Sequence, residues 1–165
     1  MNLLMGLSKM SDNLEELERR MRELERINVS IGNTKGNQPH PNFDGSYNDL
    51  FWLQHSGSTK ARIPPRPIAV ISKMSYKGED LLRKGLNKYF INLDKKSKMS
   101  AEQALTPWLK GFYEHSLSIF GNTTFLKSNA QFTIDQKGGR NTPLIDEGHL
   151  KAAWGVLIDG VRVEL

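Results

Sequence analysis

Large apolar residues alternate at spacings of four and three residues through the first part of the chain. Seven positions follow this pattern: Leu3, Leu7, Met10, Leu14, Leu17, Met21 and Leu24. The pattern is typical of an amphipathic helix with a heptad seam, which we expect over residues 1–26. Asp12, with Glu15 three residues later, is a possible helix start inside this stretch. The seam packs either on the protein's own sheet or on a partner subunit, and the spacing leaves both open.

Exposed large apolar residues in a row would favour aggregation, so part of this seam must be covered. We expect burial of its later members, Leu14, Leu17, Met21 and Leu24. Opposite charges four residues apart on a helix can also pair along its surface. The pairs with this spacing are Glu15–Arg19, Glu16–Arg20 and Glu18–Arg22.

Apolar and polar residues alternate at both ends of the remaining chain, as they do in strands. Residues 27–32 (INVSIG) indicate one short strand. Residues 152–158 and 161–165 flank Asp159-Gly160, a pair favoured in two-residue hairpin turns. These segments together predict a small antiparallel sheet.

Turn-forming residues mark the connections between these elements. Residues 33–46 are rich in Gly, Asn and Pro and are expected to form a long loop. The apolar residues 47–55 indicate a buried helical turn or a strand, and residues 57–62 a second loop. Residues 121–143 show no periodicity and are expected to be irregular, with a turn at Gly138-Gly139.

Helical periodicity returns in the middle of the chain, first over residues 81–93. After a polar break at residues 95–98, Ser100 and Gln103 have the spacing of a capping box for a helix that ends at Gly121. Pro107 should kink this helix, or restart it with Thr106 as the cap. The sum is an α+β fold in which two to three helices pack on the small antiparallel sheet. We assign residues 1–26 to an N-terminal helix and residues 27–165 to one domain.

The amino-acid composition excludes some functions that the chain could have. The net charge is +5, and lysine and arginine outnumber acidic residues between residues 73 and 110. This basic stretch suits either a solvated helix face or contact with nucleic acid. With no cysteine, the chain has no disulfide, thiolate metal site or thiol nucleophile. We expect no membrane contact and no signal peptide, because no long apolar run occurs and the first ten residues lack a basic start and a cleavage site.

Residues with catalytic potential are few. The four histidines, His40, His55, His115 and His149, form no H-x-x-x-H or H-E-x-x-H pattern, and no phosphate-binding loop or hydrolase elbow occurs. His55 and His149 could meet Asp146 and Glu147 and act as acid–base groups. Ordinary polar roles are the simpler interpretation, so we expect no enzymatic activity, no metal and no cofactor. A small basic nucleic-acid-binding protein is an alternative, although known RNA- and DNA-reading signatures are missing.

Residues 63–67 (IPPRP), the proline segment, are followed directly by the apolar residues 68–71. Three prolines fix the backbone and remove three donors, which excludes a helix and an interior strand here. The spacing Pro64-x-x-Pro67 also fits a polyproline ligand of an SH3-like groove. Such ligands are usually solvated, whereas this segment lies between apolar stretches, which disfavours that interpretation.

Two segments together resemble a family of tailed-bacteriophage virion morphogenesis proteins, the tail-completion and head–tail joining (neck) group. In that family a turn with the pattern I-P-x-R-P/S follows a His or Glu and then a Gly. After the turn come two helices, then an N-x-x-T-I-x-x-K-G segment, and finally a P-L-I-D-T-G-x-L motif. The resemblance covers residues 25–165 in order and spacing. Glu147, Ile68 and the long loop depart from the family pattern. The matching residues are His55, Gly57, Ile63, Pro64, Pro65, Arg66 and Pro67, then residues 129–138, and finally Pro143, Leu144, Ile145, Asp146, Gly148 and Leu150.

The resemblance implies a structural virion protein at the head–tail junction or tail end, assembled in the host cytoplasm. It would form a ring of six copies that contacts connector, neck or tail-tube proteins while phage DNA passes through the centre. The matching residues are then candidates for subunit contacts. We expect Arg66 to reach a carboxylate at a subunit boundary, a chain terminus or a cluster of carbonyl oxygens.

The same two motifs carry expectations about the backbone around them. After the proline segment, Ile68, Val70 and Ile71 are expected to enter the core. Residues 143–145 are expected to lead into a strand, with Asp146 accepting backbone N–H groups and Gly148 providing a turn. Such segments suit a protein whose function is shape and subunit contact.

Overall fold

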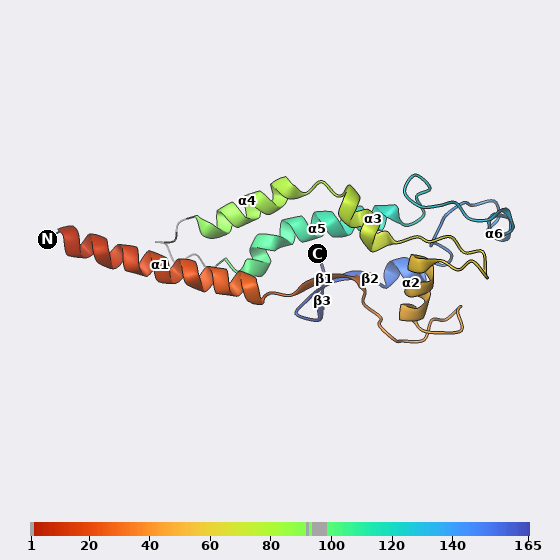
Figure 1. The fold of residues 1–165 in the computed structure, drawn as a ribbon, viewed down its shortest axis with the longest axis horizontal. Helices are drawn as coiled ribbons and strands as arrows, with labels where there is room; N and C mark the ends of the chain where they lie inside the picture. The colour runs from red at the N-terminus through yellow and green to blue at the C-terminus, as the bar shows by residue number, and fades with distance from the viewer. Residues whose placement is uncertain (1, 92, 94–98) are drawn as a thin grey trace. The chain divides into compact units, whose positions relative to one another are not determined.

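The computed structural model describes residues 2–91, 93 and 99–165, whose helices and strands are labelled in Figure 1. It divides into two compact units. Unit 1 is formed by the residues up to Asn28, by Lys77–Gly111 and by Leu165. Unit 2 is formed by Val29–Tyr76 and Phe112–Glu164. In the described part of the chain, seven helices accompany a three-stranded antiparallel sheet. The expected α+β class and antiparallel sheet are confirmed, whereas the expected number of two to three helices is wrong, because several short segments between turns are also helical. The predicted polar break at residues 95–98 lies outside the described residues.

Unit 1 is helical. It contains α1 (Asn2–Arg26), α4 (Glu79–Phe90) and the first part of α5 (Ala101–Ile119). The predicted start of α1 at Asp12 is wrong. Leucine, methionine and lysine before it are strong helix formers, so the helix extends to Asn2.

The core of unit 1 is small and closely packed. Tyr89 of α4 is buried with Ala101 and Ala104 of α5, and Leu24 of α1 packs against them. A side chain at Gly85 of α4 would overlap the carbonyl oxygen of Ala104. The backbones of α4 and α5 can therefore approach each other only because residue 85 is glycine.

The heptad seam of α1 is covered only in part. Leu17 and Leu24 are half-buried, as expected. Leu14 and Met21 are 59% and 49% exposed, so the prediction that this chain buries them is wrong. The buried side of α1 is instead centred on Arg20, which is fully buried against Tyr89 of α4. Burial of the remaining seam on another subunit stays a prediction.

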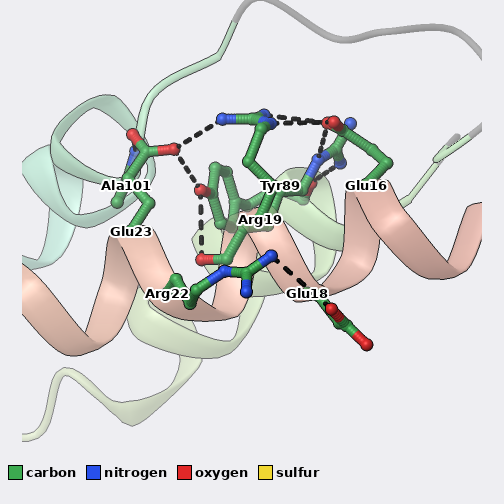
Figure 2. A network of polar contacts seen from close by, with 8 residues as sticks. Glu16, Glu18, Arg19, Arg22, Glu23, Tyr89 and Ala101 are labelled. Atoms are coloured by element: carbon green, nitrogen blue, oxygen red, sulfur yellow. Dashed lines mark hydrogen bonds and ion pairs between the residues drawn. The ribbon is translucent and has the colours of Figure 1, made fainter.

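A polar network ties α1 to α4 and α5 (Figure 2). Arg20 donates from Nε to Glu16 Oε1 at 2.7 Å and from Nη1 to the carbonyl oxygen of Tyr89. Glu23 accepts from the Tyr89 hydroxyl at 2.7 Å and from the Ala101 N–H at 2.8 Å. One carboxylate thus joins three helices, because it accepts from the side chain of α4 and the first N–H of α5.

The ion pairs of α1, one of them formed by the buried Arg20, follow the expected spacing with one exception. Glu16–Arg20 and Glu18–Arg22 are paired at 2.7 Å and 3.5 Å, as predicted. The predicted Glu15–Arg19 pair is wrong. Arg19 instead contacts Glu16 at 2.8 Å and Glu23 at 3.2 Å, because both carboxylates are held in place by their other partners.

Acidification is expected to destabilise unit 1. Hydrogen bonds from Arg19, and then from Arg20, lower the pKa of Glu16 from its ordinary 4.5 to about 2 despite its partial burial, and the Ala101 N–H chiefly lowers the pKa of Glu23. A carboxylate whose pKa is lower in the folded state stabilises the fold above the unfolded-state pKa. This contribution should therefore be lost as the pH falls from about 4.5 towards 2.

Thermal unfolding from neutral pH down to about 2 measures this loss. The melting temperature of the E16Q/E23Q variant should depend less steeply on acid than that of the wild type. The E15Q variant is the control, because Glu15 is exposed and does not belong to the network of Glu16 and Glu23. Equal acid dependence of the wild type and E16Q/E23Q would contradict the account.

Unit 2 contains the sheet, with β1 (Val29–Asn33), β2 (Trp154–Ile158) and β3 (Val161–Val163) in the order β1-β2-β3. Both neighbouring pairs are antiparallel, with Ile31 opposite Val156 and Val156 opposite Val163. Asp159 and Gly160 have φ angles of 50° and 81°, which suits the twist of a two-residue hairpin. The three predicted strands and the hairpin are confirmed, with different ends: β1 begins two residues later than predicted, and His149–Ala152 form a helix before β2.

Helices pack on this sheet around Ile68, Ile119, Phe120, Leu126 and Trp154. They are α2 (Tyr47–Ser56), α3 (Ile68–Ser75), the last part of α5 and α7 (His149–Ala152). The short α6 (Gln131–Gln136) also belongs to unit 2 but contains no buried residue. Residues 47–55, predicted as either a buried helical turn or a strand, belong to a helix. It begins with a capping box between Ser46 and Asp49. The irregular stretch predicted for residues 121–143 contains α6, so that prediction is wrong in part, while the turn at Gly138-Gly139 is confirmed by φ angles of 62° and 84°.

The long helix α5 begins and ends as predicted. Ser100 and Gln103 form the capping box, and Gly121, with a φ of 79°, follows its end. Pro107 lies inside one continuous helix, so the predicted restart at Thr106 is wrong. The Thr106 hydroxyl does not cap; it donates to the Glu102 carbonyl of the preceding turn.

The residues after the proline segment form α3, so a helix does begin there. Ile68 is buried and Ile71 packs against the core, as expected. Val70 is 45% exposed, and its predicted burial is wrong. In a helix residue 70 points away from residue 68, because each residue turns the chain by about 100°.

Candidate functional site

The two motifs singled out in the sequence border one hollow of unit 2, with a volume of about 480 Å³. The proline segment contributes Ile63, Pro64 and Arg66 to its wall. The second motif contributes Leu144, Asp146, Gly148 and Leu150. The fold therefore brings together residues that lie about eighty positions apart in the sequence.

Arg66 joins the two motifs directly. Its guanidinium donates to the carbonyl oxygens of Lys127 and Ser128 at 3.0 Å and 3.2 Å, and to Oδ1 of Asn129 at 3.1 Å. A fourth bond of 3.3 Å reaches Oε1 of Gln54 in α2. Arg66 is buried, and this burial lowers its pKa. Of the expected partners, a cluster of carbonyl oxygens is what the structure shows, within the same unit.

Gly57 lets the proline segment lie against the end of α2. Its φ is 72°, and its N–H donates to the Leu53 carbonyl at 2.8 Å. A Cβ here would lie 2.7 Å from the Ile63 oxygen and 2.8 Å from the Pro65 nitrogen. Glycine is therefore required for both the conformation and the close approach.

The second motif is held by Lys137. Its ammonium group donates to the carbonyl oxygens of Thr142 and Ile145 at 3.3 Å and 2.5 Å. Burial lowers the pKa of Lys137, and the nearby charge of Asp146 partly offsets this effect. The lysine thus closes the loop that leads from α6 into the motif.

Residues 143–145 do not lead into a strand, contrary to expectation. Pro143 is buried, Leu144 has a φ of 61°, and the chain continues through Gly148 into α7 before β2 begins. Among the described residues, no backbone N–H donates to Asp146, so its predicted role is wrong. Its charge instead acts on the nearby Lys137. The turn predicted at Gly148 is confirmed by its φ of 86°.

The structure separates the histidines proposed as acid–base groups. His149 lies 3.1 Å from Glu147, which also accepts from Asn42 at 2.9 Å. His55 lies elsewhere, stacked on the ring of Trp52 with the centroids 5.6 Å apart, and it borders a second hollow.

The imidazole ring of His40 lies near that of His149, a contact that the sequence did not predict. Its ring centroid lies 5.6 Å from that of His149. Burial first, and then His149, lower the pKa of His40. No group of three or more metal-binding side chains occurs in the described part of the chain.

The open edge of β1 is a further feature that the sequence analysis missed. The Thr34 N–H donates to the Ala153 oxygen at 2.8 Å, so Thr34 bonds toward the β2 side. In an antiparallel pair, every second residue of a strand bonds to the neighbouring strand, and the residues between them direct their N–H and C=O groups to the other side. The backbone groups of Val29, Ile31 and Asn33 therefore point away from β2. Beside this edge lies the second hollow, of about 470 Å³, lined by Ile31, Phe51, Trp52 and other residues.

Comparison with protein-family models, with curated proteins and with solved structures finds no match to this chain in any of the three. Across the described residues, no helix is both long and apolar enough to span a membrane. The contacts within the chain are therefore the basis for a functional proposal.

Proposed function

We propose that this protein is a structural component of a tailed-phage particle that acts at the head–tail junction or at the tail end. It assembles as a ring of copies, with phage DNA passing through the centre and connector, neck or tail-tube proteins as its neighbours. No catalysis, metal or cofactor takes part.

One observation carries this proposal: residues of the two family-like motifs bind one another. Arg66 of the proline segment donates to Asn129, which begins the second motif region. Lys137 of that region donates to Thr142 and Ile145 of its end. Both cations are thus used to hold loops in shape, and this use favours a scaffold over a catalytic site.

The open sheet edges support assembly as the purpose of this shape. β1 and β3 lie at the two ends of the sheet, and unpaired backbone groups at such edges readily pair with another chain. Large exposed side chains, among them Trp52 and Phe132, add apolar surface in unit 2. Contacts between copies would bury such surface.

Binding to nucleic acid is the second candidate, favoured by a group of exposed basic residues in and beside α4. These are Lys77, Arg83, Lys84 and Lys88. They would bind DNA without sequence preference and lose it as the salt concentration rises. In this second candidate function, the chain is a small DNA-binding protein that does not form a ring.

Light scattering after size-exclusion chromatography, at low and high salt and with or without duplex DNA, separates the two candidates. We expect a multimer that persists in high salt and whose mass depends on protein concentration. A chain that remains monomeric under all conditions, and that releases DNA as salt rises, would contradict the ring and favour the second candidate.

A further inference from the structure

An apolar stripe with acidic flanks runs along the exposed side of α1. Met10, Leu14 and Met21 are 64%, 59% and 49% exposed, and their spacing places them on one helix face. Glu18 and Glu25 lie beside them, one turn after Leu14 and Met21, and are also exposed. Glu18 contacts only the exposed Arg22, at 3.5 Å, a surface pair that is easily exchanged.

A basic stripe with an apolar residue lies on α4 in the same unit. Leu81 is 39% exposed, and Lys84 and Lys88 follow it at three and seven residues, on one face. The side of α4 that contains Gly85 and Tyr89 is buried in unit 1. The stripe is therefore directed to solvent, with the charge opposite to that beside the α1 stripe.

We propose that the acidic stripe of α1 docks on the basic stripe of α4 of a second copy of this chain, an inference that rests on the ring proposed above. Contact between Leu14 and Leu81 would bury apolar surface. Glu18 and Glu25, lying opposite Lys84 and Lys88, would determine which helix faces α1 and in which orientation. The apolar part is insensitive to salt, whereas the charged part is screened.

Charge is also the reason why a second α1 is not the occupant. In a coiled coil of two α1 helices, the exposed base beside Glu18 is Arg22, which already pairs with Glu18 in its own helix at 3.5 Å. Glu18 and Glu25 would therefore meet less opposite charge there than on the stripe with Lys84 and Lys88. Two different patches make a head-to-tail contact, which repeats from copy to copy and closes into a ring if the rotation allows.

A charge exchange tests this contact in the full-length protein. The acid-reversal variant is E18K/E25K, the base-reversal variant is K84E/K88E, and the third variant combines all four changes. Each reversal alone should weaken self-association by roughly tenfold or more, because like charges then meet across the contact. The combined variant should recover it, because the complementary pair is rebuilt with exchanged signs.

Sedimentation velocity at matched protein concentrations gives the association constants. The K60E/K73E variant is the control: it changes the net charge as much as K84E/K88E does, but at exposed positions of unit 2, and should assemble as the wild type. Circular dichroism should show the wild-type helix content in every variant, since all the altered side chains are exposed.

Three results would overturn the inference. If a ring forms and neither reversal weakens it, this contact is wrong and the proposed function stands. If both reversals weaken it but the combined variant fails to recover, the two stripes do not face each other. If the wild type never assembles, while only K84E/K88E loses binding to duplex DNA, the basic stripe binds nucleic acid and the ring proposal fails as well.

Discussion

Replacing Arg66 with alanine is expected to lower the free energy of unfolding of the protein by roughly 3 kcal/mol. The change removes the four hydrogen bonds that the buried guanidinium makes. It leaves the carbonyl oxygens of Lys127 and Ser128 without that donor. Because these bonds stay within unit 2, stability should fall first, and assembly should suffer in proportion.

Thermal and urea unfolding of R66A and R66K measure this effect. Lysine keeps the charge but lacks the planar fork of donors, so R66K should recover only a small part of the loss. The control is K60A, an exposed position in the adjacent loop. Wild-type stability of R66A combined with impaired assembly would instead place Arg66 at a subunit boundary, against the geometry reported above.

Replacing Gly85 with alanine should destabilise unit 1 by roughly 2–4 kcal/mol, more than an overpacked side chain usually does. The added Cβ would overlap the carbonyl oxygen of Ala104, which is backbone and cannot rotate away. The helices α4 and α5 would have to separate, and the burial of Tyr89 would be weakened. The higher helix propensity of alanine offsets only about 1 kcal/mol of this loss.

N87A in the same helix is the matched control, because Asn87 is exposed and alanine there should be neutral or slightly stabilising. Urea unfolding of both variants, followed by circular dichroism, gives the comparison. Equal stability of G85A and N87A would show that α4 and α5 do not pack as closely as described.

Local chemistry explains why several elements could be predicted from the sequence. Asp159-Gly160 needs two positive φ angles, which few residue pairs accept, and the hairpin appeared where that pair occurs. Ser100 with Gln103 marked the start of α5 because both reciprocal capping bonds form. Arg66 had to find partners outside its own segment, since prolines surround it, and carbonyl oxygens were among those expected.

Tertiary contacts decided what the sequence could not. Leu14 and Leu17 are equivalent in a heptad pattern, yet the buried Arg20 sets which side of α1 faces α4, so only one of the two leucines is half-buried. The six residues of α6 are too few for a periodic signal. The capping box of α2 could have been found from Ser46 and Asp49, although Asp stands where Glu or Gln is usual.

The sequence singled out two motifs as a candidate site, but it did not show how they are arranged or which of their residues meet. Both motifs do meet around one hollow, yet sequence order alone could not show that Arg66 would bind Asn129, or that His55 would stack on Trp52 away from His149. These contacts depend on how the loop at residues 127–129 returns to α2. The open edge of β1 could be recognised only once the strand order was known.

Electron microscopy of the purified full-length protein distinguishes a ring from any other assembly. We expect closed rings of uniform size with a central channel, built from six copies, at protein concentrations where light scattering reports the multimer. Single-copy particles at every accessible concentration, or open fibres without closure, would contradict this expectation.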